Sequence, residues 1–296
     1  MKALASTALP HAPAAATLAL PARRRPPRSA LLARAGLYLL AVLFALWVLV
    51  PIWLIAVAGF STRADVYDFP KPLLPRSVST DTMAFFVGSS GVLGALRNSI
   101  IVALVTVGLA TVIGAPAGYA IARWVFRGRE AFRLLVLSTR AFPIVILSIP
   151  LAVAFLQLGI YDSIWAVALM HTALALPFAI LITASVFVSV PVDLEEAAMT
   201  MGCSRLDAFR RVSLPLALPG LAAAAIFTFV LSWNEVFAAV ILTLRERTLP
   251  ALVLTVLNES PLPFRFAGAF FMLAPSFVFI FVIRRYLFGL WGRVLR

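Results

Sequence analysis

The chain has 296 residues, of which 62% are hydrophobic and only 12% are charged. A soluble domain carries about 45–50% apolar and about 25% charged residues, so this composition excludes an ordinary water-soluble enzyme, a disordered tail and a disulfide-rich secreted module. The formal net charge is +13, and the single cysteine, Cys203, excludes an intrachain disulfide and a multi-cysteine metal site. The composition therefore predicts an all-α integral membrane protein with several spans.

Six apolar stretches are long enough to cross a membrane, which takes about 20 residues because backbone groups find no water partners in lipid. In chain order they are Gly36–Phe60, Ser99–Ala122, Leu134–Leu156, Ile164–Val188, Leu218–Thr243 and Ala267–Phe288. The third stretch is the least regular, since it contains Arg140, Pro143 and Pro150. We predict six transmembrane helices within residues 36–296.

A basic segment, residues 1–35, precedes the first predicted span. It holds six basic residues and no acidic one. An organellar transit peptide shares this composition, but we favour a flexible cytoplasmic tail, because the segment is too rich in Ala and Pro to build a core. With the amino terminus inside, the cytoplasmic segments hold 17 basic residues and the opposite segments seven. The positive-inside rule then places both termini in the cytoplasm.

The longest cytoplasmic connection, residues 189–219, predicts two short helices outside the bilayer. Asp193, followed three residues later by Glu196, resembles a capping box, so the first helix should begin there. Gly202 is placed to end this helix in a left-handed conformation. The helix carries one apolar stripe at helical spacing. The stripe consists of Leu194, Ala197, Ala198 and Met201.

The second short helix is predicted to begin at Ser204, with Asp207 three residues later, and to end at Pro215. Two readings of the whole connection stay open. It rests on lipid headgroups, or its apolar stripe is covered by a docked protein partner or by the protein's own spans. The second reading is favoured because the anionic cytoplasmic leaflet would repel the acidic side chains of the first helix. These are Asp193, Glu195 and Glu196.

The connection resembles the EAA loop of ATP-binding-cassette (ABC) importer permeases. Glu196-Ala197-Ala198 is followed after three residues by Gly202, and after nine more by Val212, then Leu214 and Pro215. The resemblance implies that the loop, between the fourth and fifth spans, forms a coupling helix that sits in a cleft on a separate ATPase subunit. The implied coupling residues are Glu196, Ala197, Ala198, Gly202, Leu214 and Pro215.

Four further motifs are similar to the carbohydrate-uptake branch of these permeases, in particular its maltose-type second subunit. They are Arg97-Asn98-Ser99, Pro116-Ala117-Gly118-Tyr119-Ala120, Ser232-Trp233-Asn234-Glu235 and Gly289-Leu290-Trp291-Gly292. The resemblance implies a permease for a sugar, polyol or oligosaccharide in the cytoplasmic (inner) membrane of a prokaryote. Another solute class is the alternative. The implied partners are a homologous second permease, two ATPase subunits, an extracytoplasmic substrate-binding protein and membrane lipid, with no nucleic acid.

The residues of an enzyme are not evident in the sequence. A phosphate-binding loop needs a Lys that follows a Gly, and neither Lys2 nor Lys71 does so. The two histidines, His11 and His171, fit no nucleophilic triad, and we expect His171 to be a packed, hydrogen-bonded residue. We therefore predict no catalytic residue, no metal site and no cofactor in this chain, ATP being bound by partner subunits. A stand-alone secondary transporter is less favoured, because its internal repeats are not apparent.

Charged residues within predicted spans are the remaining functional candidates, because they usually face the bundle interior or water. Asn234 and Glu235 offer hydrogen-bonding groups to a polyhydroxylated solute, and a structural contact between helices explains them equally well. Glu235 and Arg140 differ in predicted depth by roughly 15 Å, too far for an ion pair. For Arg140 the structural reading is favoured.

Overall fold

The computed structural model describes residues 28–256 and 259–294, and the chain divides into two compact units, residues 1–51 and 52–296. Every regular element in the described residues is helical, as predicted. The elements are α1 (Arg28–Gly59), η1 (Asp65–Tyr67), α2 (Asp81–Gly88), α3 (Val92–Arg123), α4 (Arg129–Ser138), η2 (Thr139–Ala141), α5 (Ile144–Gln157), α6 (Ile164–Val188), α7 (Val192–Thr200), α8 (Arg205–Ala208), η3 (Phe209–Ser213), α9 (Leu214–Asn234), α10 (Phe237–Leu242), α11 (Leu249–Val256) and α12 (Leu262–Val294).

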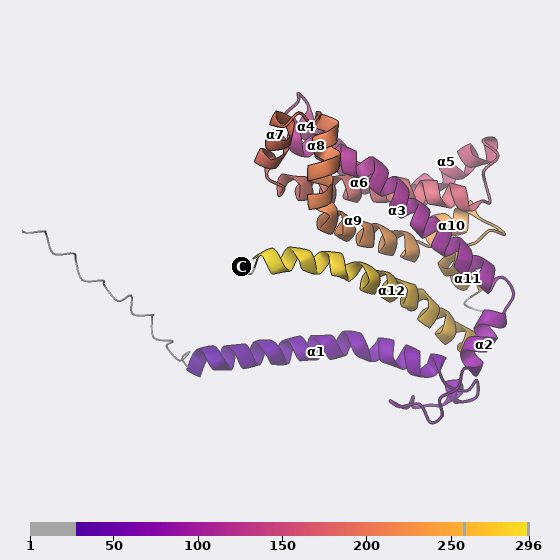
Figure 1. Ribbon diagram of the computed structural model, residues 1–296. Coiled ribbons are helices and arrows are strands. Elements are labelled where there is room, and N and C mark those ends of the chain that lie inside the picture. Colours follow the sequence, from indigo (N-terminus) through magenta and orange to yellow (C-terminus); the bar gives the residue numbers. More distant parts are fainter. Residues whose placement is uncertain (1–27, 257–258, 295–296) are drawn as a thin grey trace, which may run out of the picture. The chain divides into compact units, whose positions relative to one another are not determined.

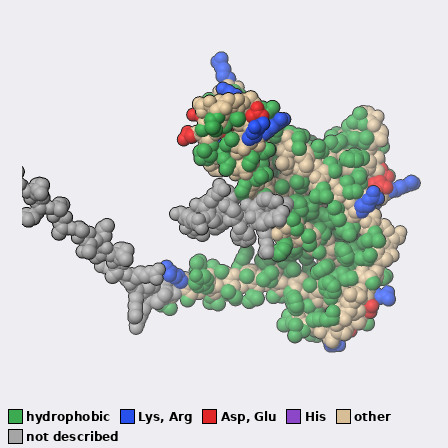
Figure 2. All heavy atoms as spheres, viewed as in Figure 1, with side chains coloured by type: hydrophobic (Ala, Val, Ile, Leu, Met, Phe, Trp, Pro, Cys, Tyr) green, Lys and Arg blue, Asp and Glu red, His purple; other side chains and the backbone are tan. Residues whose placement is uncertain are grey.

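Five of the described helices are long and apolar enough to cross a membrane, and α4 with α5 adds a sixth if this bent pair counts as one span. The helix α6 has the bounds predicted for the fourth span. The first helix, α1, begins at Arg28, inside the predicted basic tail, whose residues 1–27 lie outside the described residues. Figure 2 shows hydrophobic side chains over most of the visible face of the second unit, with charged ones gathered near its ends.

The third predicted span is broken, so the prediction of one continuous helix at Leu134–Leu156 was wrong. The segment Arg129–Ala141 and helix α5 meet at an angle of 91°. Phe142 is extended (φ −79°, ψ 123°), and so is Pro143 at the start of α5 (φ −61°, ψ 131°). Proline disfavours helical conformation in the residue before it and donates no backbone hydrogen bond, which accounts for the break.

The fifth predicted span, Leu218–Thr243, is also broken near its end. Helix α9 ends at Asn234, Glu235 is extended (φ −74°, ψ 127°), and α10 begins at Phe237. The Glu235 carboxylate accepts hydrogen bonds from the N–H groups of Ala238 and Ala239, in the first turn of α10. The side chain thus satisfies backbone donors that a helix start leaves free, and the apolar stretch becomes two helices.

Helices α3, α6 and α9 pack against one another at the centre of the second unit (Figure 1). Two glycines of α3, Gly114 and Gly118, lie against α6. A Cβ atom on Gly114 would come within 3.0 Å of the Cβ of Ala179, and the Thr183 hydroxyl donates to the Gly114 carbonyl at 2.9 Å. Gly108, by contrast, faces open space. The α3–α6 contact therefore depends on two glycines one turn apart.

Candidate functional site

The helix predicted to couple transport to an ATPase is α7, but it does not begin with a capping box. Its N-cap is Pro191, and neither Asp193 nor Glu196 caps it with a side chain, so that prediction was wrong. Pro191 is extended (φ −59°, ψ 130°), and its fixed φ suits a helix start two residues earlier than expected. Asp193 then lies inside the first turn, where the helix dipole stabilises its negative charge.

The end of α7 has the left-handed conformation that the sequence predicted. Gly202 has φ +93°, a region that is strained for residues with a Cβ atom. Its N–H donates to the Met199 carbonyl at 3.0 Å, and the N–H of Cys203 donates to the Ala198 carbonyl at 3.1 Å. This pair of bonds is a Schellman motif, which fixes where the chain leaves α7.

The second short helix begins as predicted and ends differently. The Ser204 hydroxyl accepts the Asp207 N–H at 3.1 Å, at the start of α8. Pro215 does not end this helix, because α8 continues through the π-helical turn η3 directly into α9. Pro215 lies in the first turn of α9, directly after the π-helical turn. One helical segment, Arg205–Asn234, therefore includes both the second short helix and most of the fifth predicted span.

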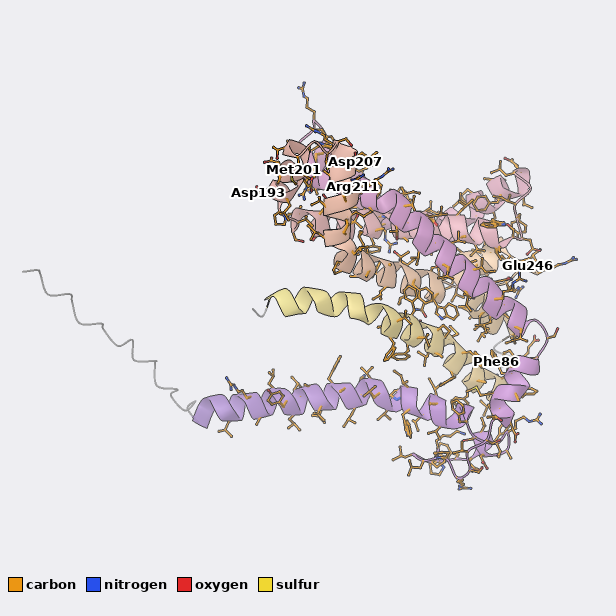
Figure 3. The ribbon with its side chains drawn as sticks, in the orientation of Figure 1. Phe86, Asp193, Met201, Asp207, Arg211 and Glu246 are labelled. Atoms are coloured by element: carbon orange, nitrogen blue, oxygen red, sulfur yellow. The ribbon has the colours of Figure 1, made fainter. Side chains whose placement is uncertain are left out.

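The apolar stripe of α7 divides into two faces. Ala198 is buried (4% exposed), whereas Leu194 is 46% exposed and Met201 80% exposed, and Ala197 is exposed as well. In Figure 3, Met201 lies at the α7 end of the second unit. The stripe is therefore covered only in part: Ala198 faces its own chain, whereas Leu194, Ala197 and Met201 remain exposed.

Glu195 is a functional candidate that the sequence analysis missed, because it was treated as one of three exposed acids. It is buried, and its carboxylate accepts hydrogen bonds from Arg123 Nε (2.7 Å) and from the Tyr119 hydroxyl (2.7 Å), both on α3. Arg123 Nη2 lies 2.6 Å from the same carboxylate and donates to the Val190 carbonyl at 2.8 Å. The side chains of this ion pair are only 8% and 6% exposed.

The protonation state of Glu195 follows from these contacts. Burial alone raises the pKa of the Glu195 carboxyl, but the hydrogen bonds from Arg123 and Tyr119 and the charge of Arg123 outweigh it, and the pKa lies below its ordinary value. The Tyr119 ring adds aromatic contacts with Phe187 and Phe209. Helix α7, the predicted coupling helix, is therefore tied to the end of α3 by an ionised ion pair that is almost fully buried.

The six predicted coupling residues occupy two places. Glu196, Ala197, Ala198 and Gly202 lie on α7 or at its end, and α7 packs on α8 and η3. Leu214 and Pro215 lie at the start of α9, where Leu214 packs into a cluster with Phe187 and Pro215 is exposed.

A cavity of about 810 Å³ lies where the two broken spans meet α6. Its lining is mainly apolar, and its polar groups include Arg140, Asn234 and Glu235. Arg140 donates to the Leu174 carbonyl at 2.9 Å, and its guanidinium lies 4.2 Å from the centre of the Phe178 ring. Although their predicted depths differ, Arg140 and Glu235 line one cavity.

Glu235 and Asn234 differ in how far their side chains are engaged in contacts within the protein. Glu235 Oε2 lies 3.1 Å from Nε2 of His171, a fully buried residue whose Nδ1 lies 2.9 Å from the Ser232 hydroxyl. This is a contact between helices of the kind that the structural reading expected, and His171 is packed and hydrogen-bonded as predicted. Asn234 is exposed, and its amide donates to the Val230 carbonyl at 2.9 Å. A solute in the cavity would therefore meet Asn234 more readily than the engaged Glu235 carboxylate.

Two curated relatives resemble the chain over most of its length. The trehalose transport system permease protein SugB of Mycobacterium tuberculosis is 34% identical over 220 residues, which cover 72% of this chain and 80% of the relative. The molybdate/tungstate transport system permease protein WtpB of Thermococcus kodakarensis is 35% identical over 198 residues, which cover 67% and 79%.

The fold matches a solved transporter, and the sequence matches a family model. A bacterial ABC transporter involved in the import of the acidic polysaccharide alginate has a chain that superposes with a TM-score of 0.72, at 22% identity, over 88% of this chain and 99% of that one. Residues 110–289, more than half of the chain, match the family described as binding-protein-dependent transport system inner membrane component. The chain therefore belongs to this family of multi-pass inner-membrane permeases of ABC importers.

Proposed function

We propose that this permease moves a sugar, polyol or oligosaccharide into the cell, together with a homologous second permease, and that two separate ATPase subunits supply the energy. An extracytoplasmic binding protein delivers the solute. The observation that carries the coupling part of the proposal is the outward apolar face of α7, formed by Leu194, Ala197 and Met201. A helix that is anchored on one face by Glu195 and open on the other is suited to docking on a partner.

The predicted coupling residues have distinct parts in this proposal. Ala197 lies on the contact surface, and Glu196, exposed beside it, offers a charge to the ATPase. Ala198 lets α7 sit close to its own chain, since it is almost fully buried. Gly202 sets the turn that orients this surface. Leu214 and Pro215 connect the loop to α9.

The solute class is a separate part of the proposal. The trehalose relative supports carbohydrate, and the cavity beside Asn234 has room for a solute of that kind. The molybdate/tungstate relative has a similar identity, so a permease for another solute class is the second candidate. In the first case Asn234 hydrogen-bonds solute hydroxyls and Glu235 holds the cavity wall in place.

Co-purification and cross-linking test the coupling part. In a Cys203→Ser background, a cysteine at Leu194 carrying a photoactivated cross-linker is expected to capture an ATP-binding-cassette ATPase, identified by mass spectrometry. A cysteine at Glu130, a charged surface residue of α4 on the same predicted side, is the matched control. Capture of lipid or of this chain alone from Leu194 would overturn the docking proposal.

Uptake by the assembled complex tests the solute class. Proteoliposomes that contain the co-purified subunits are supplied with radiolabelled trehalose, maltose, sorbitol or molybdate, each with its ATP requirement measured. ATP-dependent accumulation of a sugar or polyol is expected. Accumulation of molybdate alone would replace carbohydrate with the second candidate.

A further inference from the structure

Helix α3 is hydrogen-bonded near both of its ends to segments far away in the sequence. Near its carboxyl end, Tyr119 and Arg123 hold Glu195 of the coupling helix. Contacts between α7 and the rest of the chain are otherwise mainly with α8 and η3. The buried ion pair is therefore a direct polar connection between the predicted docking helix and a membrane span.

Near its other end, α3 is bonded to the connection between α10 and α11 and to the first residue of α11. The Asn98 amide donates to Glu246 Oε2 at 3.0 Å and to the Arg247 carbonyl at 3.3 Å. The Ser99 hydroxyl accepts the Leu249 N–H at 2.7 Å. Figure 3 shows Glu246 toward the end of α3 that lies away from α7. Residues 98 and 123 are about 37 Å apart along a helix, so the two sets of bonds lie near opposite faces of a membrane.

Between these ends, α3 is stiffened by its contact with α6. A Cβ atom on Gly118 would come within 2.7 Å of the Ala184 backbone nitrogen, so the two helices touch through their backbones. In the same region the Thr183 hydroxyl bonds to the Gly114 carbonyl. Close-packed helices of this kind shift as a unit more readily than they deform.

The segment at the far end of α3 is itself well ordered. Asp162, a left-handed residue between α5 and α6, accepts three backbone N–H groups on one carboxylate oxygen, those of Leu244 (2.7 Å), Arg245 (2.9 Å) and Glu246 (3.2 Å). These bonds lower the pKa of Asp162 against the effect of burial, which raises it. Residues 244–249 are therefore held by hydrogen bonds to both α3 and the α5–α6 connection.

We propose that α3 is the element that transmits the motion of the coupling helix across the membrane to residues 244–249, with the Arg123–Glu195 pair as its input and the Asn98–Ser99 bonds as its output. This rests on the proposed function, since an ATPase has to move α7. Arg123, Tyr119 and Glu195 are positioning residues in this scheme. In this scheme the motif Arg97-Asn98-Ser99 and the motif around Tyr119 supply the hydrogen bonds near the two ends of α3.

The test follows the far segment while nucleotide binds at the predicted cytoplasmic face. In the Cys203→Ser background a nitroxide spin label is attached to a cysteine at Leu244, an exposed residue, in the complex with its ATPase subunits. Adding the non-hydrolysable analogue AMP-PNP is expected to change the label's mobility. Glu195→Gln should reduce this change by at least about fivefold, within the range typical of allosteric coupling, while nucleotide binding is retained.

Glu130→Gln is the matched control, because it removes the acid of the exposed Arg133–Glu130 pair, and its response should equal that of the parent protein. If Glu195→Gln fails to assemble, Arg123→Lys retains the charge and loses the forked hydrogen bonding, and its response should also be reduced. An unchanged response in either assembled variant overturns the proposal.

A second arm uses both ends of α3. Asn98→Ala should reduce the response, and the double variant with Glu195→Gln should lose no more than the stronger single variant, because both changes interrupt one path. Losses that simply add overturn the proposal. Absence of any ATPase from the purified complex contradicts the proposed function instead, whereas an ATPase-bound complex whose label ignores AMP-PNP contradicts only the transmission role of α3.

Discussion

At the scale of single residues, Glu195 makes the sharpest prediction, through the pH dependence of its ion pair. Its folded-state pKa is below the ordinary value of about 4.3, so its stabilisation is fully present above that pH and is lost as the pH falls through the folded pKa. Glu195→Gln should cost on the order of 3 kcal/mol at neutral pH, because Arg123 is left buried without its partner.

The measurement is the thermal unfolding midpoint of the detergent-solubilised protein between pH 3 and pH 8. The difference between wild type and Glu195→Gln should be largest at neutral pH and should shrink below about pH 4. Glu130→Gln, which alters an exposed pair, should show little difference at any pH. A difference that is independent of pH would mean that packing, and not charge, accounts for the role of Glu195.

Gly202 makes a second prediction at this scale, based on backbone conformation alone. A Cβ atom there would meet no atom within 4 Å, so a substitution costs only the strain of a left-handed residue. Gly202→Val should destabilise the end of α7 by about 1–2 kcal/mol and reduce both ATPase association and uptake. Gly202→Asn, which tolerates this conformation, should retain most of both. Equal uptake in all three proteins would show that the turn does not orient the docking surface.

At the scale of elements, the α3–α6 contact predicts a strong dependence on side-chain size. Gly118→Ala would place a methyl group against the Thr183 hydroxyl and the Ala184 backbone nitrogen. It should lower stability by about 1–3 kcal/mol, the usual cost of overpacking. Gly108→Ala is the control on the same helix, because that position faces open space. The thermal unfolding midpoint of Gly118→Ala is expected to be lower than that of Gly108→Ala. Equal midpoints would contradict the close contact between α3 and α6.

The helix boundaries show which parts of the fold could be predicted from the sequence. Hydropathy predicted the bounds of α6, because no Asp, Glu, Lys or Arg interrupts that stretch, and it predicted the general positions of the other spans. It did not predict the break after α9, since the Glu235 side chain caps the next helix through bonds that an apolar average does not register. Pro143 marked a possible bend, but proline is also tolerated within membrane helices, and for that reason we predicted one continuous helix there.

The candidate site was predictable where it depends on local backbone chemistry. The left-handed Gly202 and the Ser204 cap follow from residues a few positions apart. Glu195 was missed because its partner, Arg123, lies 72 positions away, and only the fold brings the two together. Neighbouring Glu196 has a similar local sequence and is exposed, so the periodicity of one short helix did not reveal which acid is buried.

At the scale of the whole molecule, the distribution of basic residues predicts the direction in which the protein is inserted. Because the positive-inside rule places residues 189–219 in the cytoplasm and residues 244–266 outside, Cys203 and a cysteine introduced at Leu244 should lie on opposite sides of the membrane. Both positions are accessible, Cys203 partly and Leu244 to 62%. In intact spheroplasts a membrane-impermeant maleimide should label Leu244→Cys in the Cys203→Ser background, and it should label Cys203 of the wild type only after permeabilisation. Labelling of Cys203 in intact spheroplasts, with Leu244→Cys protected, would invert the topology and place α7 beyond the reach of any cytoplasmic ATPase.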